Sequence, residues 1–204
     1  MAITVMGANE GTMQRQLPPA ENLPARCVQI VDLGTQEEEW SGEKSLKRKI
    51  RLTWELPTVE FTGQEGDTWN PIISKEYTAS LHEKATLRKH LESWRGKPFN
   101  STELEGFDVG KLLDKTCMVQ VGHKQKATGG EYAVIANISK LPKGMDCPDR
   151  VRDLMEYSAD EGDTDTYRGF PDWLKERIAA SPEFAKGKKK GTNTDHEPSE
   201  AVPF

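Results

Sequence analysis

The sequence predicts a mainly β protein: a small five-stranded barrel with one helix between strands 3 and 4, followed by a flexible C-terminal extension that carries a short amphipathic helix. Alternating or β-branched runs bounded by turn residues recur along the chain, one stretch in its middle has helical spacing, and the composition changes near residue 144. Of the 204 residues, 35% are hydrophobic and 30% are charged. We therefore expect one compact domain with solvated appendages.

The first two strands are expected to form a hairpin. Residues 1–23 have no period and are interpreted as a flexible arm. Arg26–Leu33 is a β-branched run ended by glycine, and the polar stretch Gln36–Ser45 is expected to be the hairpin loop. Lys47–Leu56 alternates strictly, with apolar side chains on one side and charged side chains on the other. This pattern is typical of a half-buried strand.

The third strand, expected over Ile72–Leu81, leads into the only long helix of the predicted domain. Ser80 and Glu83 have the spacing of a capping box, so the helix is expected to begin there. Its apolar stripe consists of Leu87, Leu91 and Trp94. Because Trp94 completes this stripe and Trp54 shares a face with aliphatic neighbours, both tryptophans are expected in the core.

Two further strands, Thr116–Lys124 and Glu131–Leu141, surround a Gly-Gly turn. The element order over residues 24–144 is therefore three strands, one helix and two strands. This is the order of the OB-fold, a five-stranded Greek-key barrel that binds oligonucleotides in many proteins. An open α+β sheet with the same order is the alternative.

Residues 145–204 are expected to form a separate extension. They carry 9 Lys and Arg against 14 Asp and Glu, so the acidity of the chain is concentrated there. Asp146–Tyr157 is interpreted as a short helix and residues 158–166 as an acidic linker. Residues 170–184 have an amphipathic pattern and are expected to dock on the barrel or on a partner, because so short a helix is marginal alone. Its expected apolar side consists of Trp173, Leu174 and Ile178.

The sequence contains no motif of a known enzyme class, so we expect no catalytic site, cofactor or metal. His82 is interpreted as a helix-start residue and His90 as a solvent-facing helix residue. The three cysteines are odd in number and far apart in sequence, which argues against a disulfide framework and for a reduced setting. Residues 1–23 lack a signal peptide pattern, and the expected location is the cytoplasm.

Basic and aromatic side chains point instead to single-stranded nucleic acid, which is bound by cations along its phosphates and aromatic faces under its bases. Trp40 and Trp69 are assigned to loops. Tyr77 and Tyr132 fit either the core or base stacking, and Lys124 and Lys126 fit either the binding groove or a solubilising role. The candidate nucleic-acid-binding residues are Trp40, Lys44, Lys47, Lys49, Arg51, Trp69, Lys75, Tyr77, Lys124, Lys126 and Tyr132.

Four segments resemble a family of phage-encoded OB-fold single-stranded DNA-binding proteins. They are Tyr77–Lys84 (YTASLHEK), Leu91–Phe99 (LESWRGKPF), Ile138–Gly144 (ISKLPKG) and Pro171–Leu174 (PDWL). The resemblance covers roughly residues 24–144 together with Pro171–Leu174. It implies a non-enzymatic protein that coats and protects single-stranded DNA during phage replication or recombination in the cytoplasm of the bacterial host. An RNA-binding or replisome-organising OB protein, or a phage interaction or structural protein that binds no nucleic acid, are the alternatives.

The tip Val202, Pro203 and Phe204 is similar to the acidic, Pro-Phe-containing tails of bacterial single-strand binding proteins. The resemblance implies that the tail recruits replication or recombination proteins. The nearby KGKKK run and the few acids of the last ten residues depart from that pattern. A homo-oligomer is compatible with the sequence, and no membrane partner is expected.

Overall fold

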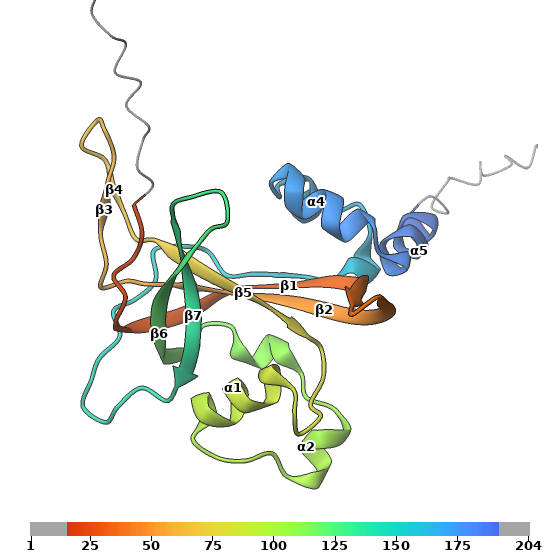
Figure 1. Ribbon diagram of the computed structural model, residues 1–204, viewed down its shortest axis with the longest axis horizontal. Helices are drawn as coiled ribbons and strands as arrows, with labels where there is room; N and C mark the ends of the chain where they lie inside the picture. Colours follow the sequence, from red (N-terminus) through yellow and green to blue (C-terminus); the bar gives the residue numbers. More distant parts are fainter. Residues whose placement is uncertain (1–15, 192–204) are drawn as a thin grey trace, which may run out of the picture.

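The computed structural model describes residues 16–191 and shows a mainly β protein (Figure 1). The backbone of Trp40 and of residues 188–191 is described without their side chains. The central sheet follows the order β5-β2-β1-β6-β7, with antiparallel neighbours throughout, and a short sixth strand, β8, pairs with β1 in parallel. Along this path the strands are β1 (Asn22–Trp40), β2 (Glu43–Glu55), β5 (Ile72–Thr78), β6 (Thr116–Gln125) and β7 (Glu131–Ser139).

The two ends of this path, β5 and β7, approach each other without pairing. Among the described residues no backbone ladder joins them, so the sheet is not a closed barrel. One side chain crosses the seam: the Lys75 ammonium group on β5 donates to the carbonyl oxygen of Ile135 on β7 at 2.7 Å. A second, two-stranded sheet of β3 (Phe61–Thr62) and β4 (Thr68–Trp69) forms a separate hairpin between β2 and β5.

The main hydrophobic core lies between the sheet and the helical segment that joins β5 to β6. This segment contains α1 (Thr86–Arg95), α2 (Ser101–Glu105) and the 3₁₀ turn η1 (Val109–Leu112). The Leu87, Leu91 and Trp94 stripe is buried as predicted, and Trp94 packs against the fully buried Trp54 with ring centroids 5.8 Å apart. The helix α1 begins at Thr86, so the prediction that it begins at Ser80 is wrong. The Ser80 hydroxyl instead accepts a hydrogen bond from the His82 amide within the loop that precedes α1.

His90 is also buried, contrary to the prediction that it faces solvent. The Tyr77 hydroxyl lies 2.9 Å from its Nδ1 atom. This pair satisfies both polar groups inside the core, and burial lowers the pKa of His90 to about 4. His82 lies in the loop before α1 and does not start the helix.

A second, smaller core covers the opposite face of β1. It is formed with β8 (Met155–Tyr157), η2 (Ala159–Glu161), α3 (Asp165–Arg168), α4 (Asp172–Ala179) and α5 (Pro182–Gly191). Figure 1 shows α4 and α5 on the side of the β1–β2 ribbon away from α1 and α2. Leu174 and Ile178 of α4 are buried against Val31 and Leu33 of β1, so the predicted docking of this amphipathic segment is confirmed.

Close packing in the second core depends on Gly34, which has φ +69°. A Cβ atom at this position would lie 2.5 Å from Cβ of Ser181, in the turn between α4 and α5. Any larger residue would therefore separate this turn from β1 and would be strained in the left-handed region.

Two sequence predictions fail in this part of the chain. Residues 36–45 form a continuous hairpin with a two-residue turn at Ser41 and Gly42, because β1 and β2 extend to Trp40 and Glu43. The segment Asp146–Tyr157 is extended instead of helical. The buried Glu55 carboxylate accepts from the amides of Val151 and Arg152, both at 3.1 Å, which fixes this backbone on the way to β8. None of the described helices is long and apolar enough to cross a membrane.

Candidate nucleic-acid interface

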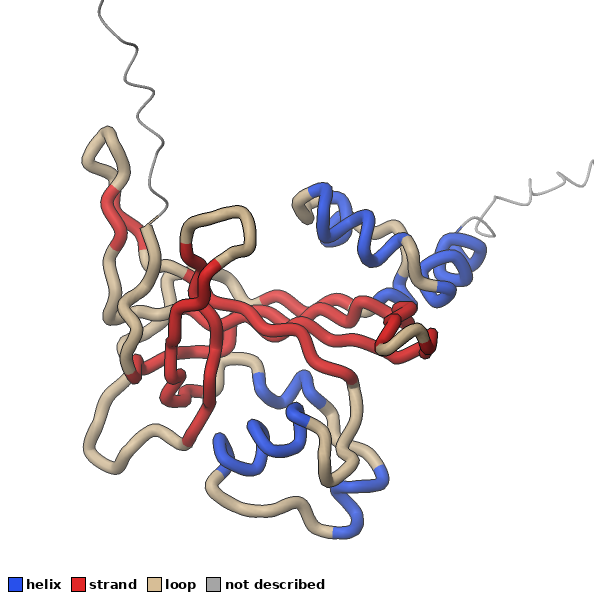
Figure 2. Tube along the Cα trace, viewed as in Figure 1, coloured by secondary structure: helices blue, strands red, loops and turns tan. Residues whose placement is uncertain are grey.

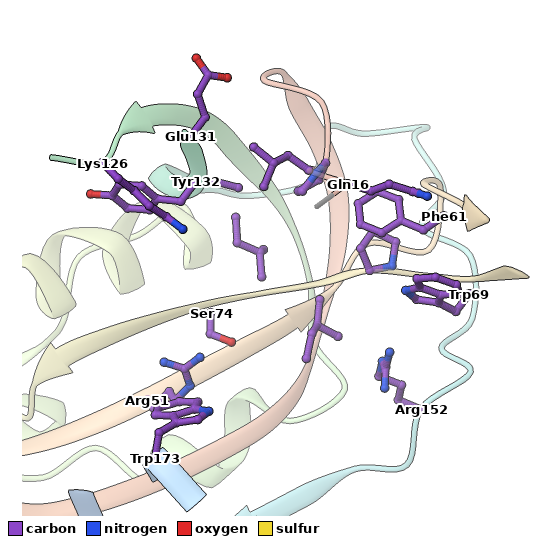
Figure 3. Close-up of a pocket in the computed structure, with 16 residues that line it drawn as sticks. Gln16, Arg51, Phe61, Trp69, Ser74, Lys126, Glu131, Tyr132, Arg152 and Trp173 are labelled. Carbon is purple, nitrogen blue, oxygen red and sulfur yellow. The ribbon is translucent and has the colours of Figure 1, made fainter. Parts of the chain in front are cut away.

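A groove of about 580 Å³ runs over the outer face of β2 and β5, between two projecting hairpins. Figure 2 shows the β3–β4 hairpin and the β6–β7 turn as the two loops that rise from the sheet on this side. Four aromatic residues, three cations and one carboxylate, that of Glu131, line the groove, together with polar and aliphatic residues (Figure 3). The aromatic residues and cations are Phe61, Trp69, Tyr132, Trp173, Arg51, Lys126 and Arg152.

The β3–β4 hairpin supplies one aromatic wall. Phe61 and Trp69 are paired across the two strands, and their rings meet edge to face with centroids 6.2 Å apart. Trp69 remains 41% exposed, which is unusual for tryptophan and leaves part of its ring accessible from the groove. A tryptophan held by a neighbouring ring but open on one side is suited to stacking.

The β6–β7 hairpin supplies the opposite wall. Its turn contains Gly129 and Gly130, both with φ above 80°, which allows the two strands to reverse tightly. Tyr132 at the start of β7 is 40% exposed and Lys126 is exposed, and Figure 3 shows both beside the groove. Tyr132 therefore lies outside the core, and both side chains line the groove.

The third side of the groove comes from the C-terminal helices. The Arg51 guanidinium lies 4.9 Å from the centroid of the Trp173 ring, and Figure 3 shows the two side chains together. Burial lowers the pKa of Arg51 from its usual value. Trp173 is 49% exposed, so it lines the groove and is not part of the buried side of α4 as predicted.

Arg152 completes the set of cations. Its backbone amide donates a hydrogen bond to the Glu55 carboxylate, and its guanidinium donates to the carbonyl oxygen of Asn70 at 3.3 Å. Within the described part of the chain, neither Arg152 nor Lys126 has a carboxylate partner, whereas Arg51 has a long ion pair with Glu76 at 3.7 Å. Two of the three cations are thus available to an anion.

The basic run of β2 has a different environment from the one expected. Lys44 pairs with Glu37 at 2.7 Å, and Lys47 and Lys49 both pair with Glu38, at 3.4 Å and 2.5 Å. Glu37 and Glu38 lie on β1, directly across the hairpin. Each of the three lysines thus already has a carboxylate partner in the protein, and their role as phosphate contacts stays a prediction.

Two more candidates, both on β5, already make contacts within the protein. Lys75 bridges to β7 as described above, and the nearby charge of Lys124 contributes to the lowering of its pKa, after burial. Tyr77 is 3% exposed and belongs to the core, so its ring cannot receive a base. Lys124 is exposed on β6 but does not line the groove.

The structure therefore brings together four of the predicted candidates: Arg51, Trp69, Lys126 and Tyr132. Trp40 lies at the end of β1 instead of in a loop, and its side chain is outside the described residues. Val202, Pro203 and Phe204 also lie outside them. Sequence reasoning missed Phe61 and Arg152, and it placed Trp173 on the apolar docking side of its helix. The partial exposure of Phe61 could have been anticipated from its short polar hairpin, but the positions of Arg152 and Trp173 depend on tertiary packing.

The chain matches no protein-family model and no curated protein. The resemblance to phage single-stranded DNA-binding proteins therefore stays a prediction. Within residues 16–191 no group of three or more His, Cys, Asp or Glu side chains is placed to hold a metal ion. Cys27 and Cys117 are buried free thiols, and burial raises the pKa of Cys27 to about 12.

Proposed function

We propose that this protein binds single-stranded DNA in the groove between the β3–β4 and β6–β7 hairpins, as a coating protein of phage replication or recombination. The observation that carries the proposal is the combination of exposed aromatic rings with unpaired cations on opposite walls of one groove. Bases stack on exposed aromatic rings, and phosphates are bound by unpaired cations. The same groove would accept single-stranded RNA, so the experiment below includes it.

We further propose that the five main strands are an OB-type barrel left open at the seam between β5 and β7. Support comes from the order of three strands, a helical segment and two strands, and from the OB-fold being a partly open barrel. OB-folds bind oligonucleotides over strands 2 and 3 and the last hairpin, which here correspond to β2, β5 and the β6–β7 turn. The loop between strands 1 and 2, often used as well, is here a two-residue turn outside the groove.

Recruitment of replication or recombination proteins by Val202, Pro203 and Phe204 is a separate part of the proposal. It is carried by the similarity of this tip to bacterial tails, and no described residue bears on it. Capture of known replication proteins by the full chain and by a Phe204→Ala variant would test it without involving the groove.

The main test is a fluorescence anisotropy titration with a labelled oligo-dT, repeated with oligo-U. The double variant Trp69→Ala/Tyr132→Ala should weaken binding strongly, since each stacked base contributes about 1 to 3 kcal/mol. Leu104→Ala is the matched control, because Leu104 is similarly exposed at 38% but lies on α2. Tighter binding of oligo-U would favour an RNA-binding protein. Equal affinity of the double variant and the control would contradict the groove as the binding site.

A further inference from the structure

A second hollow, of about 460 Å³, lies where α1 ends and where β6 begins and β7 ends. It shares no lining residue with the DNA groove. Its volume falls in the range of ligand-binding clefts, roughly 300 to 1,000 Å³. A ligand of this hollow would therefore bind independently of the ligand proposed for the groove.

The floor of this hollow is apolar. It is made by Trp94, Phe107, Leu112 and Leu141. The single polar atom of Trp94 is already used, since its Nε1 donates to the Thr116 carbonyl oxygen at 2.8 Å. The floor thus offers burial and van der Waals contact to an apolar side chain of a ligand. Neither the Trp94 ring nor the Phe107 ring presents an unsatisfied polar atom to that ligand.

The rim of the hollow is basic. It carries Arg95, Lys111, Lys115 and Lys140. The three lysines are exposed, and none has an ion-pair partner in the described part of the chain. The carboxylate nearest in sequence, Asp114, is instead paired with Arg26 at 3.3 Å and Arg150 at 3.4 Å. The rim is therefore a local excess of positive charge in a protein whose net charge is −5.

Arg95 differs from the lysines because it is held in place. Its guanidinium lies 4.3 Å from the centroid of Phe99 and 5.6 Å from that of Phe107, and it forms an ion pair with Glu103. Its Nη1 atom is buried without a hydrogen-bond partner in the described structure. Because Glu103 already pairs with Arg95, this side chain mainly holds the edge of the apolar floor, and the three lysines are the rim cations open to a carboxylate.

We propose that this hollow binds an acidic peptide segment of a partner protein, with one bulky apolar side chain on the floor and carboxylates against the basic rim. Single-stranded nucleic acid fits less well. Trp94 is only 6% exposed, and the Phe107 ring is occupied by Arg95 and meets Phe99 edge to face at 5.2 Å, so no aromatic face is open to a base. A DNA-coating protein could then hold its strand and a partner on different faces.

The test is fluorescence anisotropy with a panel of labelled peptides in which Phe, Trp, Leu or Ile is flanked by acidic residues on both sides. The triple variant Lys111→Gln/Lys115→Gln/Lys140→Gln should bind the best peptide about tenfold more weakly, equivalent to about 1.4 kcal/mol. The control Lys44→Gln/Lys84→Gln/Lys89→Gln removes the same charge from other exposed positions and should bind like the wild type. Both triple variants alter only exposed side chains, so folding should be retained.

A second peptide series, in which alanine replaces the central apolar residue, should bind about tenfold more weakly to the wild-type protein, because the floor is then left empty. The proposal is overturned if no peptide of the panel binds, if the rim variant binds as well as the control, or if the alanine series binds equally. It is also overturned if the rim variant loses affinity for oligo-dT and keeps its affinity for peptide, since the hollow would then contact nucleic acid.

Discussion

The groove and the distal half of the β1–β2 hairpin both carry basic side chains, but the two regions differ in what surrounds each charge. In the distal hairpin, residues 35–40 and 43–49, the lysines pair with glutamates on the opposite strand. In the groove, Lys126 and Arg152 lie beside aromatic rings and have no carboxylate partner among the described residues. A run of basic residues thus indicates a polyanion site only where the neighbouring strand does not neutralise it.

The largest effect that separates the two regions should come from removing two cations from each. Lys126→Gln with Arg152→Gln should weaken oligo-dT binding on the order of tenfold at low salt, whereas Lys44→Gln with Lys47→Gln should change it little. Each lost phosphate contact also reduces the slope of log affinity against log salt by about 0.7, so the groove variant should differ by about 1.4. Salt titrations of both variants measure this. A larger change in the hairpin variant would reverse the comparison.

The free energy of unfolding should depend on pH through the buried His90. Burial lowers the pKa of His90 to about 4, from 6.5. The unfolded chain therefore takes up this proton at a higher pH than the folded chain does, and the free energy of unfolding falls as the pH drops from about 6.5 to about 4.

His90→Gln should lose this component of the pH dependence, measured by urea denaturation from about pH 7 to about pH 4.5. The lysine variants described above serve as controls and should follow the wild-type slope. An unchanged slope for His90→Gln would mean that the imidazole is accessible to protons in the folded protein.

The smallest effect should come from unmasking the distal hairpin. Glu37→Gln with Glu38→Gln frees Lys44, Lys47 and Lys49 from their partners. The pairs of Lys44 and Lys47 are exposed and contribute only about 0 to 1 kcal/mol each to stability, and the buried Lys49 keeps its hydrogen bond to Thr78 at 2.9 Å. We expect a nearly unchanged melting temperature and a gain in oligo-dT affinity of about threefold or less, confined to low salt. Loss of affinity in this variant would show that the glutamates support binding instead of masking it.

The sequence predicted the features that depend on a single strand or helix. Alternation predicted β2, the Gly-Gly turn helped to predict β6 and β7, and the spacing of Leu87, Leu91 and Trp94 predicted the core face of α1. The distal hairpin was missed because its strands are polar on both faces and are joined by ion pairs across the ladder, which leave no hydrophobic period. The short β8 was missed because a buried carboxylate in another strand fixes its approach.

The candidate site was predictable to the extent that hairpin tips favour exposure. Lys126, in the loop between β6 and β7, follows from this rule, whereas Trp69 lies in β4 instead of in the expected loop and Tyr132 was left open between the core and base stacking. Trp173 could not be placed, because its pattern on α4 matches that of Leu174 and Ile178, and only the docking angle of the helix turns its ring toward Arg51. The burial of Tyr77 and His90 likewise depends on each providing the other's hydrogen-bond partner.

The irregularities of β1 have a consequence for how side chains are distributed between the two cores. Register shifts occur between Cys27 and Gln29 and between Asp32 and Gly34. The first shift keeps Ile30 in the main core and turns Val31 and Leu33 toward the C-terminal helices. Removing the unpaired Val28 at this bulge would leave the pairs of Cys27 with Trp54 and of Ile30 with Leu52 in place, so the inward and outward sets would be kept. Removing one residue from a regularly paired part of β1 would instead exchange the two sets beyond the deletion, since register has a period of two. The protein's tolerance of a single deletion in β1 thus depends on where the deletion falls.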